Sequence, residues 1–165
     1  YDVTYGYGLY VAVGDSGKLT TSPDGITWTS RTSGFCGNLI LGVTYGNGLY
    51  VAVGNSGILT TSPDGITWTV RTSGIGTTTI LGVTYGNGLF VAVGDSGVLI
   101  TSPDGINWTA RTSGFGTPTI YDVTYGNGLY VAVGGSGVLT TSQSQNTILL
   151  PKIELTNTQA FIKAV

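Results

Sequence analysis

Side chains that can carry out acid–base or nucleophilic chemistry are scarce in this sequence. The chain has no histidine, one cysteine (Cys36) and one glutamate (Glu154). General acid–base catalysis needs positioned titratable groups, and glycoside hydrolysis needs a pair of carboxylates. Asp2 and Asp122, both in the sequence YDVTYG, form the one candidate acidic pair. We therefore expect a non-catalytic protein without a cofactor or a metal site.

A turn followed by a tryptophan is the next set of residues with chemical potential. The segment SPDGITWT occurs at residues 22–29 and 62–69, and it returns as SPDGINWT at 102–109. Its aspartate can act as a ligand or acid, and its tryptophan can stack on a sugar. In a Pro-Asp-Gly turn, however, the aspartate usually caps backbone amides. We expect a structural role for these residues, which are Ser22, Asp24, Trp28, Ser62, Asp64, Trp68, Ser102, Asp104 and Trp108.

Arginine and tyrosine are the remaining side chains suited to ligand binding. Each arginine stands late in an expected outer strand, opposite the tryptophan face, so we expect it to pair with an aspartate of the adjacent unit. Convergence of the arginines on a ligand carboxylate is the alternative. One tyrosine per unit lies in the sequence VTYG, before a turn. The candidate ligand-binding residues are Tyr5, Tyr45, Tyr85, Tyr125, Arg31, Arg71 and Arg111.

A 40-residue repeat positions all these residues. Units 41–80 and 81–120 differ at only eight of forty positions, residues 1–40 form a first unit in the same phase, and a fourth keeps the pattern over 121–142. Tandem near-identity at this period is typical of propellers, solenoids and related repeat folds.

Turn signals divide each unit into four short strands. In the second unit they are Asn47-Gly48, Gly54-Asn55-Ser56-Gly57 and Pro63-Asp64-Gly65, and Asn-Gly is a strong hairpin signal. The segments between them are rich in Val, Ile, Leu, Thr, Tyr and Trp, which favour strands. We expect strands at about 41–46, 49–54, 58–62 and 66–72, with Ile66, Trp68 and Val70 on one face.

Four-stranded antiparallel units in tandem predict an all-β protein with the β-propeller fold. A solenoid or a sandwich fits less well. Four units permit a closed four-bladed ring, or a partial ring that a second copy of the chain completes. Near-identical blades favour such exchange, so a homo-oligomer is expected as one possibility.

The last 23 residues, 143–165, depart from the repeat and lack the Pro-Asp-Gly turn and the tryptophan. Residues 147–150, 153–156 and 160–165 are expected strands, of which the first can supply the missing outer strand of the fourth unit. The alternative is a segment for attachment or assembly.

The repeated turn resembles the Asp-box of sialidase-like (BNR) propellers, written S-x-D-x-G-x-T-W. Residues 22–28 are one residue shorter, because glycine directly follows aspartate, and they are more similar to the S-P-D-G-x-x-W units of bacterial and phage propeller repeats. The resemblance covers 1–142. It implies that the box joins the third and fourth strands, that its Ser and Asp stabilise the turn, and that its Trp packs between blades. The tail, LLPKIELTNTQAFIKAV, resembles the ends of phage tail-fibre and virion proteins.

Composition limits the function. Only 8% of the residues are charged, the net charge is −2 and the mean hydropathy is +0.27. The six basic residues are scattered, which argues against nucleic-acid binding. No apolar run approaches the length that spans a bilayer, so we expect no membrane insertion. The chain begins at Tyr1, so we expect a processed product, a fragment or part of a longer protein.

These features predict a binding or adhesion propeller, located outside the cell or on a virion. Its partner is expected to be a surface glycan or a protein receptor. One alternative is a structural decoration of a phage particle or filament, bound to other subunits through residues 143–165. A sialidase-like hydrolase that uses Asp2 and Asp122 is the other.

Overall fold

The computed structural model describes residues 1–143 and 153–154 of the chain. They form four antiparallel sheets, each with four strands in consecutive order. The first sheet contains β1 (Asp2–Gly6), β2 (Leu9–Val13), β3 (Lys18–Ser22) and β4 (Thr29–Thr32). The second contains β5 (Ile40–Gly46), β6 (Leu49–Gly54), β7 (Leu59–Ser62) and β8 (Thr69–Arg71). The third contains β9 (Ile80–Gly86), β10 (Leu89–Gly94), β11 (Leu99–Ser102) and β12 (Thr109–Arg111). The fourth contains β13 (Ile120–Gly126), β14 (Leu129–Gly134), β15 (Val138–Gln143) and β16 (Ile153–Glu154).

The predicted turn residues make the hairpins. Asn47 and Gly48 join β5 to β6 with φ angles of 49° and 75°, both in the left-handed region. In the first sheet Tyr7 takes the place of the asparagine and has a φ of 46°. The second and third strands are joined by short 3-10 turns, η1 (Asp15–Gly17), η2 (Asn55–Gly57), η3 (Asp95–Gly97) and η4 (Gly135–Gly137).

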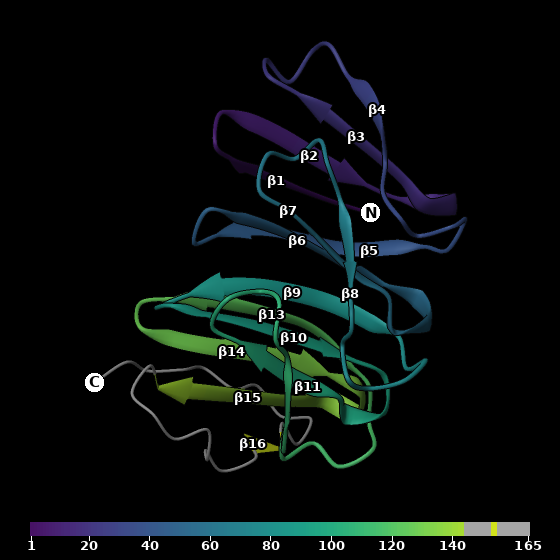
Figure 1. Cartoon of the computed structure of the whole chain (residues 1–165). Helices are drawn as coiled ribbons and strands as arrows, with labels where there is room; N and C mark the ends of the chain where they lie inside the picture. The colour runs from purple at the N-terminus through teal and green to yellow at the C-terminus, as the bar shows by residue number, and fades with distance from the viewer. Residues whose placement is uncertain (144–152, 155–165) are drawn as a thin grey trace.

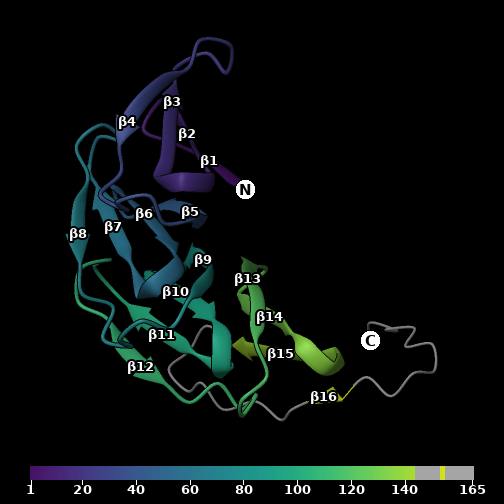
Figure 2. The same ribbon diagram turned by 90° about the vertical axis from the view of Figure 1, so that its right-hand side faces the viewer.

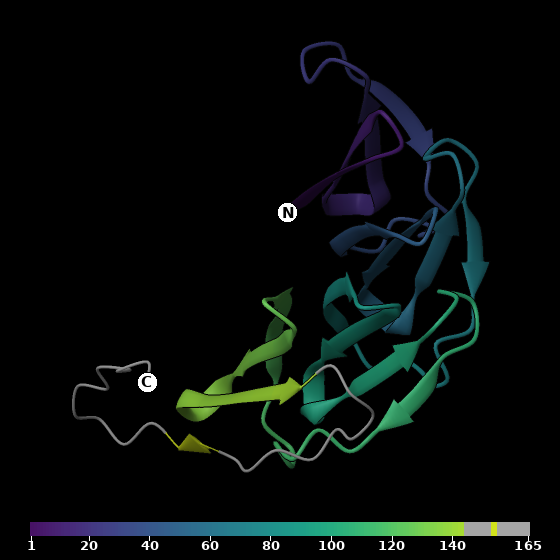
Figure 3. The same cartoon turned by 90° about the vertical axis from the view of Figure 1, so that its left-hand side faces the viewer.

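The four sheets stand side by side like blades along an open arc (Figures 1 and 3). The first strands, β1, β5, β9 and β13, lie on the concave side of this arc, and the fourth strands β4, β8 and β12 follow its convex side (Figures 2 and 3). We call the sheet β1–β4 blade 1, and we call the following sheets in chain order blades 2, 3 and 4. Of the two ring forms expected from the sequence, the structure is a partial ring.

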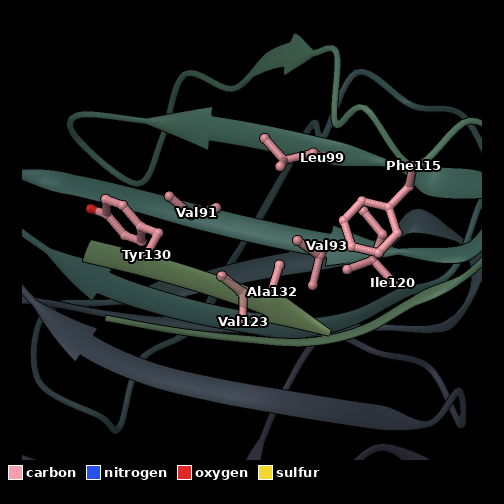
Figure 4. Packing of buried hydrophobic residues seen from close by; sticks show 8 residues of the cluster. All are labelled: Val91, Val93, Leu99, Phe115, Ile120, Val123, Tyr130 and Ala132. Carbon is pink, nitrogen blue, oxygen red and sulfur yellow. The ribbon is translucent and has the colours of Figure 1, made fainter. Parts of the chain in front are cut away.

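The hydrophobic core consists of three similar layers, one between each pair of neighbouring blades. The layer between blades 3 and 4 is typical: Val91, Val93, Leu99 and Phe115 of blade 3 pack against Ile120, Val123, Tyr130 and Ala132 of blade 4 (Figure 4). Equivalent residues form the layers between blades 1 and 2 and between blades 2 and 3. Because both faces of blades 2 and 3 are covered, β6 and β10 are apolar on both sides, as the run LYVAV predicts.

Two expectations about the outer strands were wrong. The strand expected at 66–72 is only Thr69–Arg71, and Ile66 lies in the preceding turn. Ile66 and Val70 are 47% and 56% exposed, so they do not share a buried face with Trp68. In blade 4 the strand that pairs with β15 is Ile153–Glu154, which falls within the expected strand 153–156, and not the segment 147–150 that was expected to complete this blade. The expected strands at 147–150 and 160–165 themselves lie outside the described residues.

Candidate functional site

A row of four tyrosines follows the concave side of the arc, with one tyrosine in each first strand. The ring of Tyr45 lies directly on Gly6 of blade 1, where a Cβ atom would come within 2.1 Å of the ring. Tyr85 covers Gly46, and Tyr125 covers Gly86, in the same way. Each of these three rings therefore contacts the glycine that directly follows the tyrosine of the preceding blade. The fold therefore brings together all four predicted tyrosines, Tyr5, Tyr45, Tyr85 and Tyr125, which we call the tyrosine row.

The tyrosine row combines a supported ring with a free polar end. Each ring also packs against an aromatic ring on the second strand of its own blade, with centroids 4.6–4.8 Å apart. Tyr45, Tyr85 and Tyr125 are half-buried, and Tyr5 is 58% exposed. Their hydroxyl groups form no hydrogen bond with any residue that the structure describes. Rings held in place with unpaired hydroxyls are well suited to bind a ligand.

The aspartate of each Pro-Asp-Gly turn serves the turn itself. One oxygen of the Asp64 carboxylate accepts hydrogen bonds of 2.8 Å from the amides of Ile66 and Thr67 and from the Ser62 hydroxyl. These bonds, first that from Thr67, lower the pKa of Asp64 to about 2. The Asp24 and Asp104 carboxylates make the equivalent bonds. The pKa of Asp24 is also lowered to about 2 by the amide of Thr27 above all, and that of Asp104 lies well below its ordinary value because of Asn107.

The tryptophans of these turns pack between blades where a preceding blade exists. Trp68 and Trp108 are half-buried against the layers between blades 1 and 2 and between blades 2 and 3. Each indole N–H donates to a glycine carbonyl in its own turn, at 3.0 Å. Trp28, on blade 1, is 41% exposed. The packing role expected for this residue type therefore depends on the neighbouring blade.

The arginines are not part of the tyrosine row. They lie on β4, β8 and β12, on the convex side of the arc, so they do not converge (Figure 3). The Nε of Arg71 donates to the Thr61 hydroxyl at 2.9 Å, and the other two make the same bond within their own blades. The expected pairing with an aspartate of the adjacent blade was therefore wrong.

The two aspartates proposed as an acidic pair lie at opposite ends of the arc. Asp2 accepts hydrogen bonds of 2.8 Å from the amides of Val3 and, in blade 2, Val43. Asp122 accepts one from the amide of Val123. Because β1 and β13 belong to the two end blades, the structure does not bring Asp2 and Asp122 together within one chain (Figure 3).

Sequence reasoning missed two tyrosines that join neighbouring blades. The Tyr50 hydroxyl donates to the carbonyls of Gly6 and Leu9 in blade 1. The Tyr130 hydroxyl donates to the equivalent carbonyls, those of Gly86 and Leu89. Burial of Tyr50 raises its pKa to about 12. The sequence shows that this position is always aromatic, with Phe90 in place of tyrosine in the third unit. It does not show that the hydroxyl group bonds to the preceding blade.

The described residues contain no cluster of three or more acidic, cysteine or histidine side chains that can hold a metal ion. They also contain no helix long and apolar enough to cross a membrane.

Comparisons with known proteins identify a fold but no family. No known family model and no curated protein matches the sequence. Among solved structures, YCF48 bound to a D1 peptide is similar with a TM-score of 0.69 and 20% identity, over 88% of this chain and 50% of that chain. The WD40 β-propeller domain of Doa1 gives a TM-score of 0.66 and 12% identity, over 94% of this chain and 54% of that one.

The computationally designed protein Ika8 gives a TM-score of 0.70 and 10% identity, over 92% of this chain and 48% of that one. The chain thus spans about half the length of the structures that it matches. At these identities the likeness shows the fold alone. The four consecutive four-stranded blades and these similarities confirm the fold class predicted from the repeat: the protein is a β-propeller.

Proposed function

We propose that the protein is a non-catalytic binding module and that the tyrosine row is its binding surface. The observation that carries this proposal is the row of four equivalent aromatic rings with unpaired hydroxyls on the concave side of the arc. Tyrosine is enriched in binding surfaces because it offers a large rigid apolar area together with one polar group.

The repetition of the row indicates the type of ligand. Identical sites at a regular spacing suit a polymer with repeated units, because linked weak contacts gain affinity from multivalency. A surface glycan or an extended segment of a protein receptor has this property. An extended protein segment is supported as the ligand by the similar propeller YCF48, whose solved structure contains a bound peptide. The proposed location is outside the cell or on a virion, as the sparse charge suggests.

Binding to glycan and peptide arrays, followed by titration of each hit, tests this proposal. Tyr45→Phe combined with Tyr85→Phe keeps the rings over Gly6 and Gly46 and removes only two hydroxyls. We expect this variant to bind about 10-fold more weakly, because each ligand hydrogen bond contributes about 0.5–1.5 kcal/mol. Arg71→Gln, on the convex side, is the control and should bind like the wild type. Blank arrays, or loss of binding in Arg71→Gln alone, would contradict the proposal.

A structural role in a particle or filament is the second candidate. The observation that favours it is the exposure of apolar faces at both ends of the arc, where Val3 is 57% and Val133 is 41% exposed. Tail residues 143–165 are the proposed attachment segment. Deleting residues 155–165, which keeps β15 and β16 of blade 4, should abolish incorporation into the particle without unfolding the blades.

A further inference from the structure

Each boundary between neighbouring blades is built from the same two unlike faces. The leading blade contributes the second-strand side chains Val11 and Val13 in blade 1, together with Leu19 and Phe35. The following blade contributes Val43, Tyr50 and Ala52, with Tyr45 and Trp68 at the edge. The next two boundaries repeat this pattern at a spacing of 40 residues. We call these the leading face and the following face.

The following face of blade 1 has no partner within the described chain. Val3 is 57% exposed, whereas its equivalents Val43, Val83 and Val123 are only 4%, 8% and 5% exposed. Tyr10 is 37% exposed, whereas Tyr50 at the same position in blade 2 is fully buried. The same side chains that form the core elsewhere are therefore left in contact with solvent.

The leading face of blade 4 is open in the same way. Val133 is 41% exposed, whereas its equivalents Val13, Val53 and Val93 are at most 5% exposed. Val131 is half-buried, whereas its equivalents Val11, Val51 and Val91 are buried. Blade 4 therefore presents the surface against which a following face packs at the three internal boundaries.

Gly126 supplies the most specific observation. Gly6, Gly46 and Gly86 each lie beneath the tyrosine ring of the next blade, which leaves no room for a Cβ atom. Nothing lies within 4 Å of a Cβ atom built on Gly126, and its φ angle is not in the left-handed region. Neither space nor backbone conformation within the described chain requires a glycine there. A following face packed on blade 4 would require it, because the tyrosine equivalent to Tyr5 would cover it.

We propose that a second copy of this chain occupies these faces, so that two copies close one ring. Blade 1 of each copy packs on blade 4 of the other, which gives two equivalent contacts. In each contact Tyr5 covers Gly126, and the Tyr10 hydroxyl donates to the carbonyls of Gly126 and Leu129. These are the contacts that Tyr125 and Tyr130 make with Gly86 and Leu89.

The curvature of the arc supports closure by two copies rather than by another number. Four blades match about half the length of the similar propellers, at TM-scores of 0.66 to 0.70. Two copies therefore supply about as many residues as a whole propeller of that curvature contains. Both ends of the arc also open toward the same side (Figure 3).

Sedimentation velocity and native mass spectrometry of the 165-residue chain test the proposal. We expect a species of twice the 17.0 kDa mass of one chain. Gly126→Leu fills the space reserved for the Tyr5 ring and should weaken association about 10- to 100-fold, the usual effect of overpacking by 1–3 kcal/mol. Thr77→Leu, which adds the same side chain at an exposed position in the loop between β8 and β9, is the matched control and should leave association unchanged.

Mixing two variants tests the direction of the contact. Val3→Glu damages only the following face and Gly126→Leu only the leading face, so a mixed pair keeps one intact contact. An equimolar mixture should therefore associate more strongly than either variant alone, and circular dichroism should show that each variant stays folded. The proposal is overturned if the wild-type chain stays monomeric, if it forms larger assemblies, or if both variants associate normally.

Discussion

Thr60 carries a buried hydroxyl group whose removal should stabilise the protein. The side chain is fully buried in β7, at the boundary of blades 1 and 2, and among the described residues its Oγ1 has no hydrogen-bond partner. Valine has nearly the same shape but no hydroxyl group. Leaving a buried polar group unpaired costs about 1–3 kcal/mol, so Thr60→Val should raise the free energy of unfolding by about 1–2 kcal/mol. For a chain of this size that corresponds to a rise in Tm of roughly 2–8 °C.

The neighbouring residue provides a matched control. Thr61 is also buried, but its hydroxyl accepts a hydrogen bond of 2.9 Å from Arg71 Nε. Thr61→Val removes this bond and should lower the free energy of unfolding by about 1 kcal/mol. Urea unfolding followed by tryptophan fluorescence measures both changes, at a single protein concentration because association stabilises the folded state. A neutral or destabilising effect of Thr60→Val would show that its hydroxyl is paired and would refute the reasoning.

Two other predictions concern the tyrosines between blades and the aspartates of the turns. Tyr50→Phe should lower the free energy of unfolding by about 0.5–1.5 kcal/mol, because it removes the hydroxyl bond to blade 1. Phe90→Tyr should raise it by a similar amount, because it adds the equivalent bond between blades 2 and 3. Changes of the same sign in urea unfolding would contradict this explanation. The pKa of Asp24 and of Asp64 is about 2 in the folded chain against an ordinary value of 3.8, so their stabilising effect is complete above that value and is lost as the pH falls toward 2. Thermal unfolding between pH 4 and pH 2 should therefore depend less steeply on pH in Asp64→Asn than in the wild type, and an unchanged slope would contradict this explanation.

The repeat allowed the fold to be predicted because its turns are set locally. Asn47-Gly48 and Pro63-Asp64-Gly65 have the φ angles and side-chain acceptors that their turns need, whatever surrounds them. Strand order then follows, since short turns can only join neighbouring antiparallel strands. The run LYVAV, which is apolar on both faces, likewise predicted a second strand that neighbouring blades cover on both sides.

The features that the sequence did not predict correctly depend on how the blades are placed relative to one another. A single sequence does not contain these distances. The short outer strand left Ile66 in a turn and Val70 in solvent, because only three residues of β8 pair with β7. The arginine found its partner in its own blade, where Thr61 lies one strand away. The curvature of the arc, and with it the separation of Asp2 from Asp122, comes from the packing of whole faces rather than from any single motif.

Some side chains that differ between the repeats compensate one another across the boundary between neighbouring blades. Phe35 of blade 1 meets a blade with Thr60, whereas Ile75 of blade 2 meets a blade with Ile100, so a large residue on one face accompanies a small one on the other. This compensation is why valine rather than isoleucine is the appropriate replacement for Thr60. The boundary already holds Phe35, so the larger isoleucine would overfill the layer, at a cost of about 1–3 kcal/mol. If side-chain volume is matched between two faces, the pair of neighbouring blades is the unit of packing. Blade 1 and blade 4 each hold half of such a pair, and the two halves are complementary to each other.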